Sequence, residues 1–191
     1  MSREARQLLP RVERQQKILE GAAAAFAQRG FAQTSMDEVA SASGITKLIV
    51  YRHFPSKEDL YRAVLDQTFQ QLAQELAAGR QRSERGAGVR AVLRVGRRQP
   101  DALRLLLVHA PREPQFAEYA ARIRERSVQV VLRGRPSRDP TLARWMAQMA
   151  VTYVFEGVLC WLDVGDPSRD EEFAARCHAG LAAMAEALRG G

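Results

Sequence analysis

Glycine and proline interrupt the first third of the chain at three places, and these breaks divide it into separate helices. Gly30, Gly44 and Pro55 each follow a segment whose apolar residues recur at helical spacing. Glycine is the usual residue just beyond a helix C-terminus, and proline cannot continue a helix. The sequence therefore predicts a helix over residues 11–29, a short helix before Gly44 and another that ends near His53.

The helix starts are marked as clearly as the ends. Ser35 and Glu38 have the spacing of a capping box, in which each side chain satisfies a backbone N–H group at the other residue. Ser56 and Asp59 repeat that spacing where a long amphipathic helix is expected to begin. Thr46 can cap the short helix that precedes Pro55. Together these signals predict four helices within the first 78 residues.

Residues 35–54 have the dimensions of a helix-turn-helix, a motif that presents its second helix to the major groove of DNA. That helix begins with Thr46 and Lys47, and the N-terminal residues of such a helix reach base edges and phosphates. Lys57 lies in the first turn of the next helix, where a cation opposes the helix dipole, so it indicates an external anion. These features predict a DNA-binding surface.

The charge of the chain agrees with that prediction without requiring it. The formal net charge is +7, and a basic balance is a signal for nucleic-acid binding. A GC-rich genome, which encodes arginine in place of lysine, explains the composition equally well. Many arginines lie within residues 80–138, where a solvated face is the favoured interpretation. An anionic effector and long-range attraction to DNA are the alternatives.

Residues 16–65 resemble the N-terminal domain of the TetR family of bacterial regulators. The matching positions are Ile18, Leu19, Gly21, Ala22, Phe26, Gly30, Thr34, Ser35, Val39, Ala40, Ser43, Gly44, Ile45, Thr46, Val50, Tyr51, Arg52, His53, Phe54, Ser56, Lys57, Glu58 and Leu60. The resemblance implies a homodimer in which two DNA-binding domains sit on a larger domain that binds a small effector. It also implies a repressor that leaves a palindromic double-stranded operator when the effector binds.

The resemblance implies DNA contacts at particular residues. Thr46 and Lys47 would touch DNA from the start of the recognition helix, and Tyr51 would bond a phosphate and lean on a base or sugar. His53 and Lys57 would approach the DNA backbone. A surface or packing role is the alternative for Tyr51 and, with more weight, for His53. The other predicted DNA-binding residues are Thr34, Ser35, Leu48 and Arg52. Leu48, where the family usually has a small residue, either contacts a thymine methyl or shifts the helix.

The rest of the chain is also predicted to be helical, which gives an all-α fold. After a polar loop over residues 79–88, the expected helices are 89–98, 100–109, 113–133, 139–164 and 168–188. We assign residues 11–54 to the helix-turn-helix domain and 56–78 to a connecting helix. Residues 79–191 then form the effector-binding and dimerisation domain.

The segment 139–164 carries apolar residues around almost its whole circumference, and such a helix must be buried all round. We expect it to pack with the helix 168–188 against the same pair in a second subunit, as a four-helix interface. A monomer core is the alternative. The predicted interface residues are Val154, Val158, Trp161, Leu162, Phe173, Cys177, Leu181 and Met184.

The effector site is less well defined, because apolar pocket residues look like core residues. The candidates are Phe69, Leu106, His109, Phe116, Tyr119, Trp145, Met149, Tyr153 and Glu156. A carboxylate among aromatic residues is costly unless paired. Glu156 therefore binds a cationic or hydrogen-bonding effector, forms a salt bridge across the dimer, or points to water.

Several other classes of protein are disfavoured. The sequence contains no zinc helix, P-loop or Gly-x-Ser-x-Gly elbow, so no enzyme activity, metal or cofactor is expected. Cys160 and Cys177 are far apart, which fits a reducing compartment; redox sensing is a minor alternative, as is non-specific nucleic-acid binding. The N-terminus lacks a signal peptide, and charges interrupt the apolar stretches, so we expect a cytoplasmic protein that does not enter a membrane.

Overall fold

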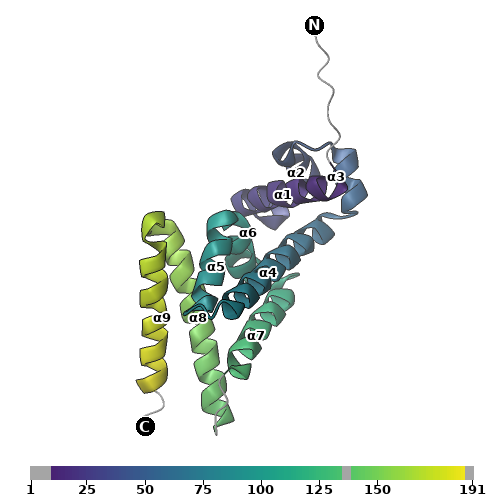
Figure 1. Ribbon diagram of the computed structural model, residues 1–191. Coiled ribbons are helices and arrows are strands. Elements are labelled where there is room, and N and C mark those ends of the chain that lie inside the picture. Colours follow the sequence, from purple (N-terminus) through teal and green to yellow (C-terminus); the bar gives the residue numbers. More distant parts are fainter. Residues whose placement is uncertain (1–9, 135–138, 188–191) are drawn as a thin grey trace. The chain divides into compact units, whose positions relative to one another are not determined.

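The computed structural model describes residues 10–134 and 139–187, and these residues form helices and no strand (Figure 1). The all-α fold predicted from the sequence is confirmed. The chain divides into two compact units, Met1–Asp66 and Gln67–Gly191. Helix α4, Lys57–Gln81, begins in the first unit and ends in the second.

The first unit is a small helical domain built around an aromatic cluster. Its elements are α1 (Arg11–Gln33), α2 (Met36–Ser43), α3 (Lys47–His53) and the first turns of α4. The ring of Tyr61 lies edge-on to Phe26 and Phe31, with centroids 5.0 and 5.2 Å away. Val39 and Val50, from the two short helices, are fully buried. Aromatic pairs of this geometry add to the free energy gained by burial, so the cluster holds short helices that would not persist alone.

Gly30 interrupts α1 at the predicted place. Its φ of +77° and ψ of 164° fall in a region that essentially only glycine occupies. The break lets Phe31 turn back into the aromatic cluster, where it is 6% exposed. The helix predicted over residues 11–29 is confirmed, and the segment Phe31–Gln33 follows it on the other side of the break.

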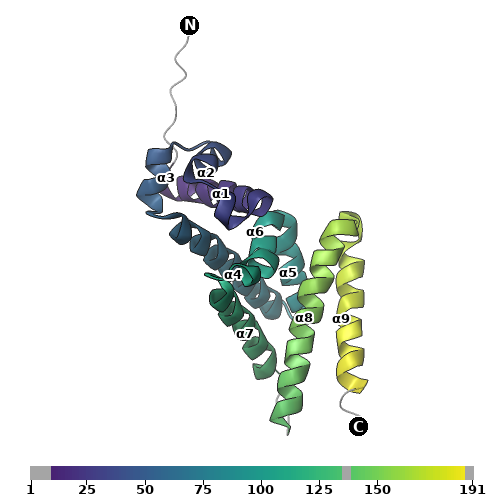
Figure 2. The ribbon, with the colours of Figure 1, turned by 180° about the vertical axis from the view of Figure 1, so that it is seen from behind.

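The second unit contains the remaining helices. They are α5 (Ala87–Arg98), α6 (Pro100–Arg104), a π-type turn η1 (Leu105–His109), a 3₁₀ turn η2 (Ala110–Arg112), α7 (Ala117–Arg133), α8 (Pro140–Val164), a 3₁₀ turn η3 (Pro167–Arg169) and α9 (Asp170–Ala187). Helices α8 and α9 run side by side in opposite directions in both views (Figures 1 and 2). Helix α8 also packs against α5 and α7.

The loop predicted over residues 79–88 is wrong at both ends. Helix α4 continues to Gln81 and α5 begins at Ala87, which leaves a turn of only five residues. The glycine at position 79 favoured a loop, but Gly79 lies inside α4. A side chain at this position would press on its neighbours, since a Cβ on Gly79 would lie 3.0 Å from the Cβ of Ala87. Close packing therefore explains the glycine.

Helix α7 begins at Ala117, four residues later than predicted. The predicted final residue, Leu188, and residues 135–138 of the arginine-rich segment lie outside the described residues.

Helix α8 spans almost the predicted residues but is not buried all round. Trp145, Met149 and Tyr153 are 46%, 40% and 42% exposed, although the helix packs on three neighbours. Contrary to the sequence expectation, α8 is long and apolar enough to cross a membrane by length and composition alone. Core helices of soluble proteins pass the same test, so it carries little weight. Part of its apolar surface is therefore exposed in the single chain.

Candidate DNA-binding surface

Helix α2 is capped at both ends, and its C-terminal cap forms the turn into α3. Ser35 N–H donates to the Glu38 carboxylate over 2.7 Å, and Glu38 N–H donates to the Ser35 hydroxyl over 3.2 Å. The predicted capping box is therefore confirmed. Gly44 adopts the left-handed conformation with φ of +65°, and Ile45 N–H donates to Ala40 O over 3.1 Å. These contacts set the crossing of the two short helices.

Gly21 lets α1 approach the end of α2 closely, a packing role that the sequence analysis did not assign to it. A Cβ on Gly21 would lie 2.6 Å from the backbone nitrogen of Ser43, at the end of α2. A side chain on α1 at this point would push the end of α2 outward, and with it the turn that places α3. The signal in the sequence was a glycine inside a helical segment, which often marks a close approach of two backbones.

Helix α3 buries one side and presents the other to solvent. Val50 has no exposed surface, whereas Leu48 and Tyr51 are 64% and 43% exposed. Lys47 and Arg52 are exposed as well. This exposed side of α3, together with Thr46 at its start, is called the α3 face below. It contains five of the nine predicted DNA-binding residues on one short helix and its cap.

Thr46 is the N-cap of α3 by position but makes no side-chain capping bond. The predicted cap is therefore wrong in its chemistry, and the exposed hydroxyl is not used to close the helix. Lys47 Nζ donates to the Asp37 carboxylate over 2.8 Å. That hydrogen bond raises the pKa of Lys47 above the ordinary lysine value, so the side chain is fully protonated at neutral pH. Asp37 was not predicted to belong to this surface.

Thr34 was predicted to touch DNA, but its side chain is buried and engaged within the first unit. The residue is 1% exposed, and its hydroxyl donates to Gly30 O over 2.7 Å and to Ala25 O over 3.2 Å. It closes the interrupted end of α1 and cannot reach a phosphate without unfolding that end. Ser35 beside it is exposed, but its side chain is engaged with Glu38.

Lys57 has partners inside the protein. Its ammonium group donates to Phe31 O over 2.8 Å and to Ala32 O over 3.3 Å, and lies 4.5 Å from the centre of the Phe31 ring. A cation is favourable beside the carbonyl groups that end a helix. The sequence argument that this lysine requires an external anion is therefore wrong. A phosphate contact from Lys57 stays a prediction.

His53 is half-buried at the end of α3. Partial burial and the positive charges of Arg11 and Arg14 lower its pKa below the ordinary histidine value. These effects favour the neutral imidazole in the chain without DNA. At the start of α4, the Ser56 hydroxyl accepts from Asp59 N–H over 3.0 Å and donates to the Asp59 carboxylate over 2.7 Å.

In the second unit, the structure separates the effector candidates into two groups. Leu106 and Phe116 are 2% and 0% exposed, and Phe69, His109 and Tyr119 are half-buried. The other group, Trp145, Met149, Tyr153 and Glu156, lies on the exposed side of α8. Together with Cys160, these side chains recur every three or four residues and so share one side, called the α8 stripe below.

Half of the eight predicted interface residues are engaged or buried within their own chain. Trp161 stacks on Phe173 with ring centroids 4.8 Å apart, and its indole N–H donates to Asp170 over 2.7 Å. Val158 is 0% exposed and Cys177 is 5% exposed, so both side chains pack inside their own chain. The sequence pattern could not fix which side of α8 and α9 faces outward, and an interface on these two helices stays a prediction. Val154, Leu162, Leu181 and Met184 are half-buried.

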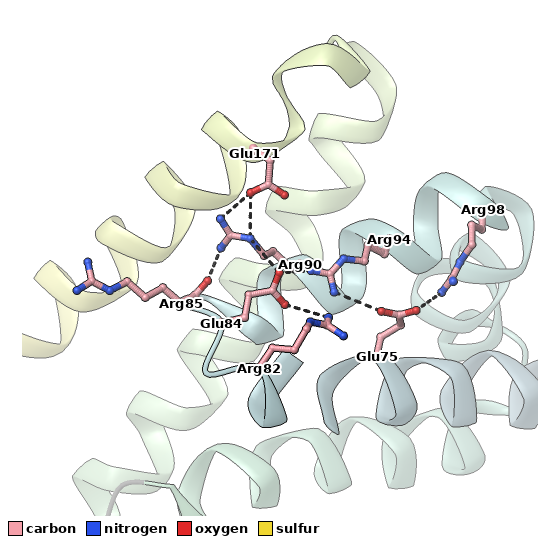
Figure 3. A network of polar contacts seen from close by, with 8 residues as sticks. All are labelled: Glu75, Arg82, Glu84, Arg85, Arg90, Arg94, Arg98 and Glu171. Atoms are coloured by element: carbon pink, nitrogen blue, oxygen red, sulfur yellow. Dashed lines mark hydrogen bonds and ion pairs between the residues drawn. The ribbon is translucent and has the colours of Figure 1, made fainter. Parts of the chain in front are cut away.

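Many arginines of the segment 80–138 hold helices together, as Figure 3 shows. Arg94 pairs with Glu75 of α4 over 3.3 Å and with Glu84 of the following turn. Arg90 pairs with Glu171 of α9 over 2.8 Å, and its side chain is only 13% exposed. The favoured interpretation, a solvated face, is therefore wrong for these arginines.

Comparison with known proteins agrees with this geometry. Residues 18–64 match the model of the bacterial regulatory proteins of the tetR family. Over 57 residues the chain is 46% identical to the HTH-type transcriptional activator FasR of Mycolicibacterium smegmatis, a match that covers 30% of this chain and 26% of FasR. The chain thus aligns with only about a quarter of the length of this curated relative.

Solved structures extend the likeness of fold to nearly the whole chain. A TetR-like transcriptional regulator from Rhodococcus sp. RHA1 superposes with a TM-score of 0.78 at 21% identity, covering 94% of this chain and 98% of that one. AibR, crystallised in complex with isovaleryl coenzyme A and operator DNA, superposes with a TM-score of 0.61 at 21% identity, covering 86% and 96%. The N-terminal helices and the helical C-terminal region therefore share a fold with these regulators.

Proposed function

We propose that the chain, whose residues 18–64 match the model of the bacterial regulatory proteins of the tetR family, is a sequence-specific DNA-binding repressor. The family is one of regulators and not of enzymes, in agreement with the sequence prediction. The proposed protein is a cytoplasmic homodimer that binds a palindromic operator and releases it when a small effector binds. Residues 11–54 would bind DNA, 56–78 would connect, and 79–191 would bind effector and dimerise.

The observation that carries the proposal is the α3 face. Lys47 and Arg52 supply exposed cations, Thr46 and Tyr51 supply hydroxyl groups, and the buried Val50 anchors the helix from behind. Such a surface suits both phosphate contacts, which position a protein on DNA, and base contacts, which give specificity. The capping box and Gly44 hold the two helices at the crossing that lets one of them enter the major groove.

Selection of bound sequences from a random DNA library at near-physiological salt tests this proposal. We expect an enriched palindrome whose half-sites are about one helical turn apart, since a two-fold dimer presents two recognition helices. Binding with a steep salt dependence and no enriched sequence would overturn the proposal in favour of non-specific nucleic-acid binding. A reporter gene placed behind the selected site determines the direction of regulation: repression is expected, and activation, the function in the name of FasR, would contradict it.

We assign the dimer interface to the α8 stripe and the adjoining side of α9. Met149 is 40% exposed there. The stripe adjoins α9 at Tyr153, whose hydroxyl oxygen would lie 2.8 Å from a Cβ built on Gly180. Met149→Arg is expected to halve the particle mass in light scattering. Val12→Arg, at an apolar residue of α1 that is 78% exposed, is the matched control and should leave the mass unchanged. An unchanged mass for Met149→Arg would place the interface elsewhere.

The effector would bind within the second unit, where the buried candidates Leu106 and Phe116 lie. AibR supports a small-molecule effector, because its structure holds isovaleryl coenzyme A together with operator DNA. That acyl thioester is the first probe, because it is the ligand of a protein with a similar fold. Release of labelled operator on titration with it, read as a fall in fluorescence anisotropy, would support effector control. Unchanged anisotropy would exclude this class of effector.

A further inference from the structure

Leu48 is the most exposed apolar side chain of the α3 face. It lies in the first turn of α3 and is 64% exposed, while Val50, two residues on, is fully buried. Tyr51 lies three residues beyond Leu48 and therefore on the same side of the helix. The leucine thus follows Lys47 in the sequence and shares its side of the helix with Tyr51, on the surface that the proposed function turns toward DNA.

The chemistry of the major groove leaves an apolar side chain one matching group. The base edges there carry hydrogen-bond donors and acceptors, and the only apolar group among them is the 5-methyl group of thymine. Guanine, adenine and cytosine present polar atoms that a leucine cannot pair, so facing them would leave those atoms unsatisfied. An exposed leucine at this position therefore favours thymine over every other base.

We infer that Leu48 is a specificity-determining residue that contacts the methyl group of one thymine in each operator half-site. This inference rests on the proposed function, because it requires a specific DNA site. Lys47 and Tyr51 would fix the helix through polar contacts on either side, and Leu48 would then distinguish thymine by burying its methyl group. Burial of one methyl-sized apolar group changes affinity by about fourfold per half-site.

Replacement of thymine by deoxyuridine tests the contact, because uracil keeps every hydrogen-bonding group of thymine and lacks only the methyl group. Each thymine of the selected operator is replaced in turn, symmetrically in both half-sites, and the dissociation constant is measured for three proteins. They are the wild type, Leu48→Ala and Lys47→Ala. Leu48 is largely exposed and alanine favours helices, so the first variant is expected to fold.

At one thymine per half-site, the wild type is expected to bind the uracil operator about fifteenfold more weakly, since two methyl groups are lost. Leu48→Ala should reduce that ratio to about twofold or less. Lys47→Ala should weaken binding to both operators and keep the wild-type ratio. A ratio that persists in Leu48→Ala, or the absence of any thymine sensitive to the replacement, would overturn the inference. Failure of the library to yield any enriched site would instead overturn the proposed function, before a uracil is introduced.

Discussion

Charged pairs at two places in this chain differ in how firmly they are held. On the α3 face, Lys47 and Asp37 form a single pair whose side chains are 54% and 64% exposed. In the second unit, Arg94 joins Glu75 and Glu84, and these side chains are only 31%, 19% and 22% exposed. An exposed pair contributes little to stability and can exchange its partner, whereas a shielded network loses more when one member is removed. The same chemistry is thus available for recognition in one place and used for architecture in the other.

The largest expected effect is on operator affinity, through the exposed pair of Lys47 and Asp37. Lys47→Ala should weaken binding to the selected operator by about tenfold or more. It should leave the unfolding transition in urea unchanged, because its ion pair is exposed. Fluorescence anisotropy with labelled operator measures the affinity. Lys17→Ala removes another exposed lysine of the first unit, and an equal loss for that control would show that only net charge matters.

A smaller effect is expected on the architectural side. Arg94→Met removes the cation shared by Glu75 and Glu84 and should lower the free energy of unfolding by about 1–2 kcal/mol, allowing for its partial exposure. Urea denaturation followed by circular dichroism measures this change. Arg82→Met is the matched control: its side chain is 57% exposed and its guanidinium lies 3.5 Å from Glu84, so almost no change is expected. Equal effects of the two substitutions would contradict the distinction drawn here.

The pH dependence of stability sharpens the same point. The hydrogen bond from Arg94 lowers the pKa of Glu84 below the ordinary glutamate value of 4.5. Burial raises the pKa of Glu75, but hydrogen bonds from Arg98 and Arg94 lower it more, so the pKa of Glu75 also lies below the ordinary value. The stabilisation from both groups is therefore complete above pH 4.5 and is lost as the pH falls through their lower folded-state pKa values.

Between pH 5 and pH 3, the urea midpoint of the wild type should therefore fall more than that of Arg94→Met. The gap in urea midpoint between the wild type and Arg94→Met should therefore be smaller at pH 3 than at neutral pH. Other carboxylates titrate in both proteins and lower both midpoints. Parallel declines would show that these glutamates keep ordinary pKa values and that the network contributes no pH-dependent stability.

The parts of the structure that could be predicted from the sequence depend on contacts between near neighbours in the chain. The capping box of Ser35 and Glu38 closes over three residues, and Gly30 and Gly44 act through their own backbone angles. Such features need no knowledge of the tertiary fold. This is why the first unit was predicted almost element by element, and why the α3 face could be placed.

The errors arose where packing, and not the local sequence pattern, decides the outcome. Thr34 and Ser35 have similar side chains, yet Thr34 is buried, with its hydroxyl bonded to carbonyl groups of α1, and Ser35 is exposed. Lys57 binds a carbonyl group 26 residues earlier in the sequence. Helix α8 is apolar on nearly every side, so its sequence could not show that Val158 faces inward and Met149 outward.

Asp37 offers the smallest effect and the sharpest test of how the exposed pair works. On DNA, its carboxylate would repel phosphate and hold Lys47 back from it, so Asp37→Asn should strengthen operator binding by about threefold. The dependence of affinity on salt should also become steeper, since one more cation is free to displace counterions. In the double variant Lys47→Ala/Asp37→Asn, most of this gain should disappear if it acts through the lysine. Weaker binding by Asp37→Asn alone would mean that the carboxylate orients Lys47 toward DNA, and the exposed pair would then be architectural as well.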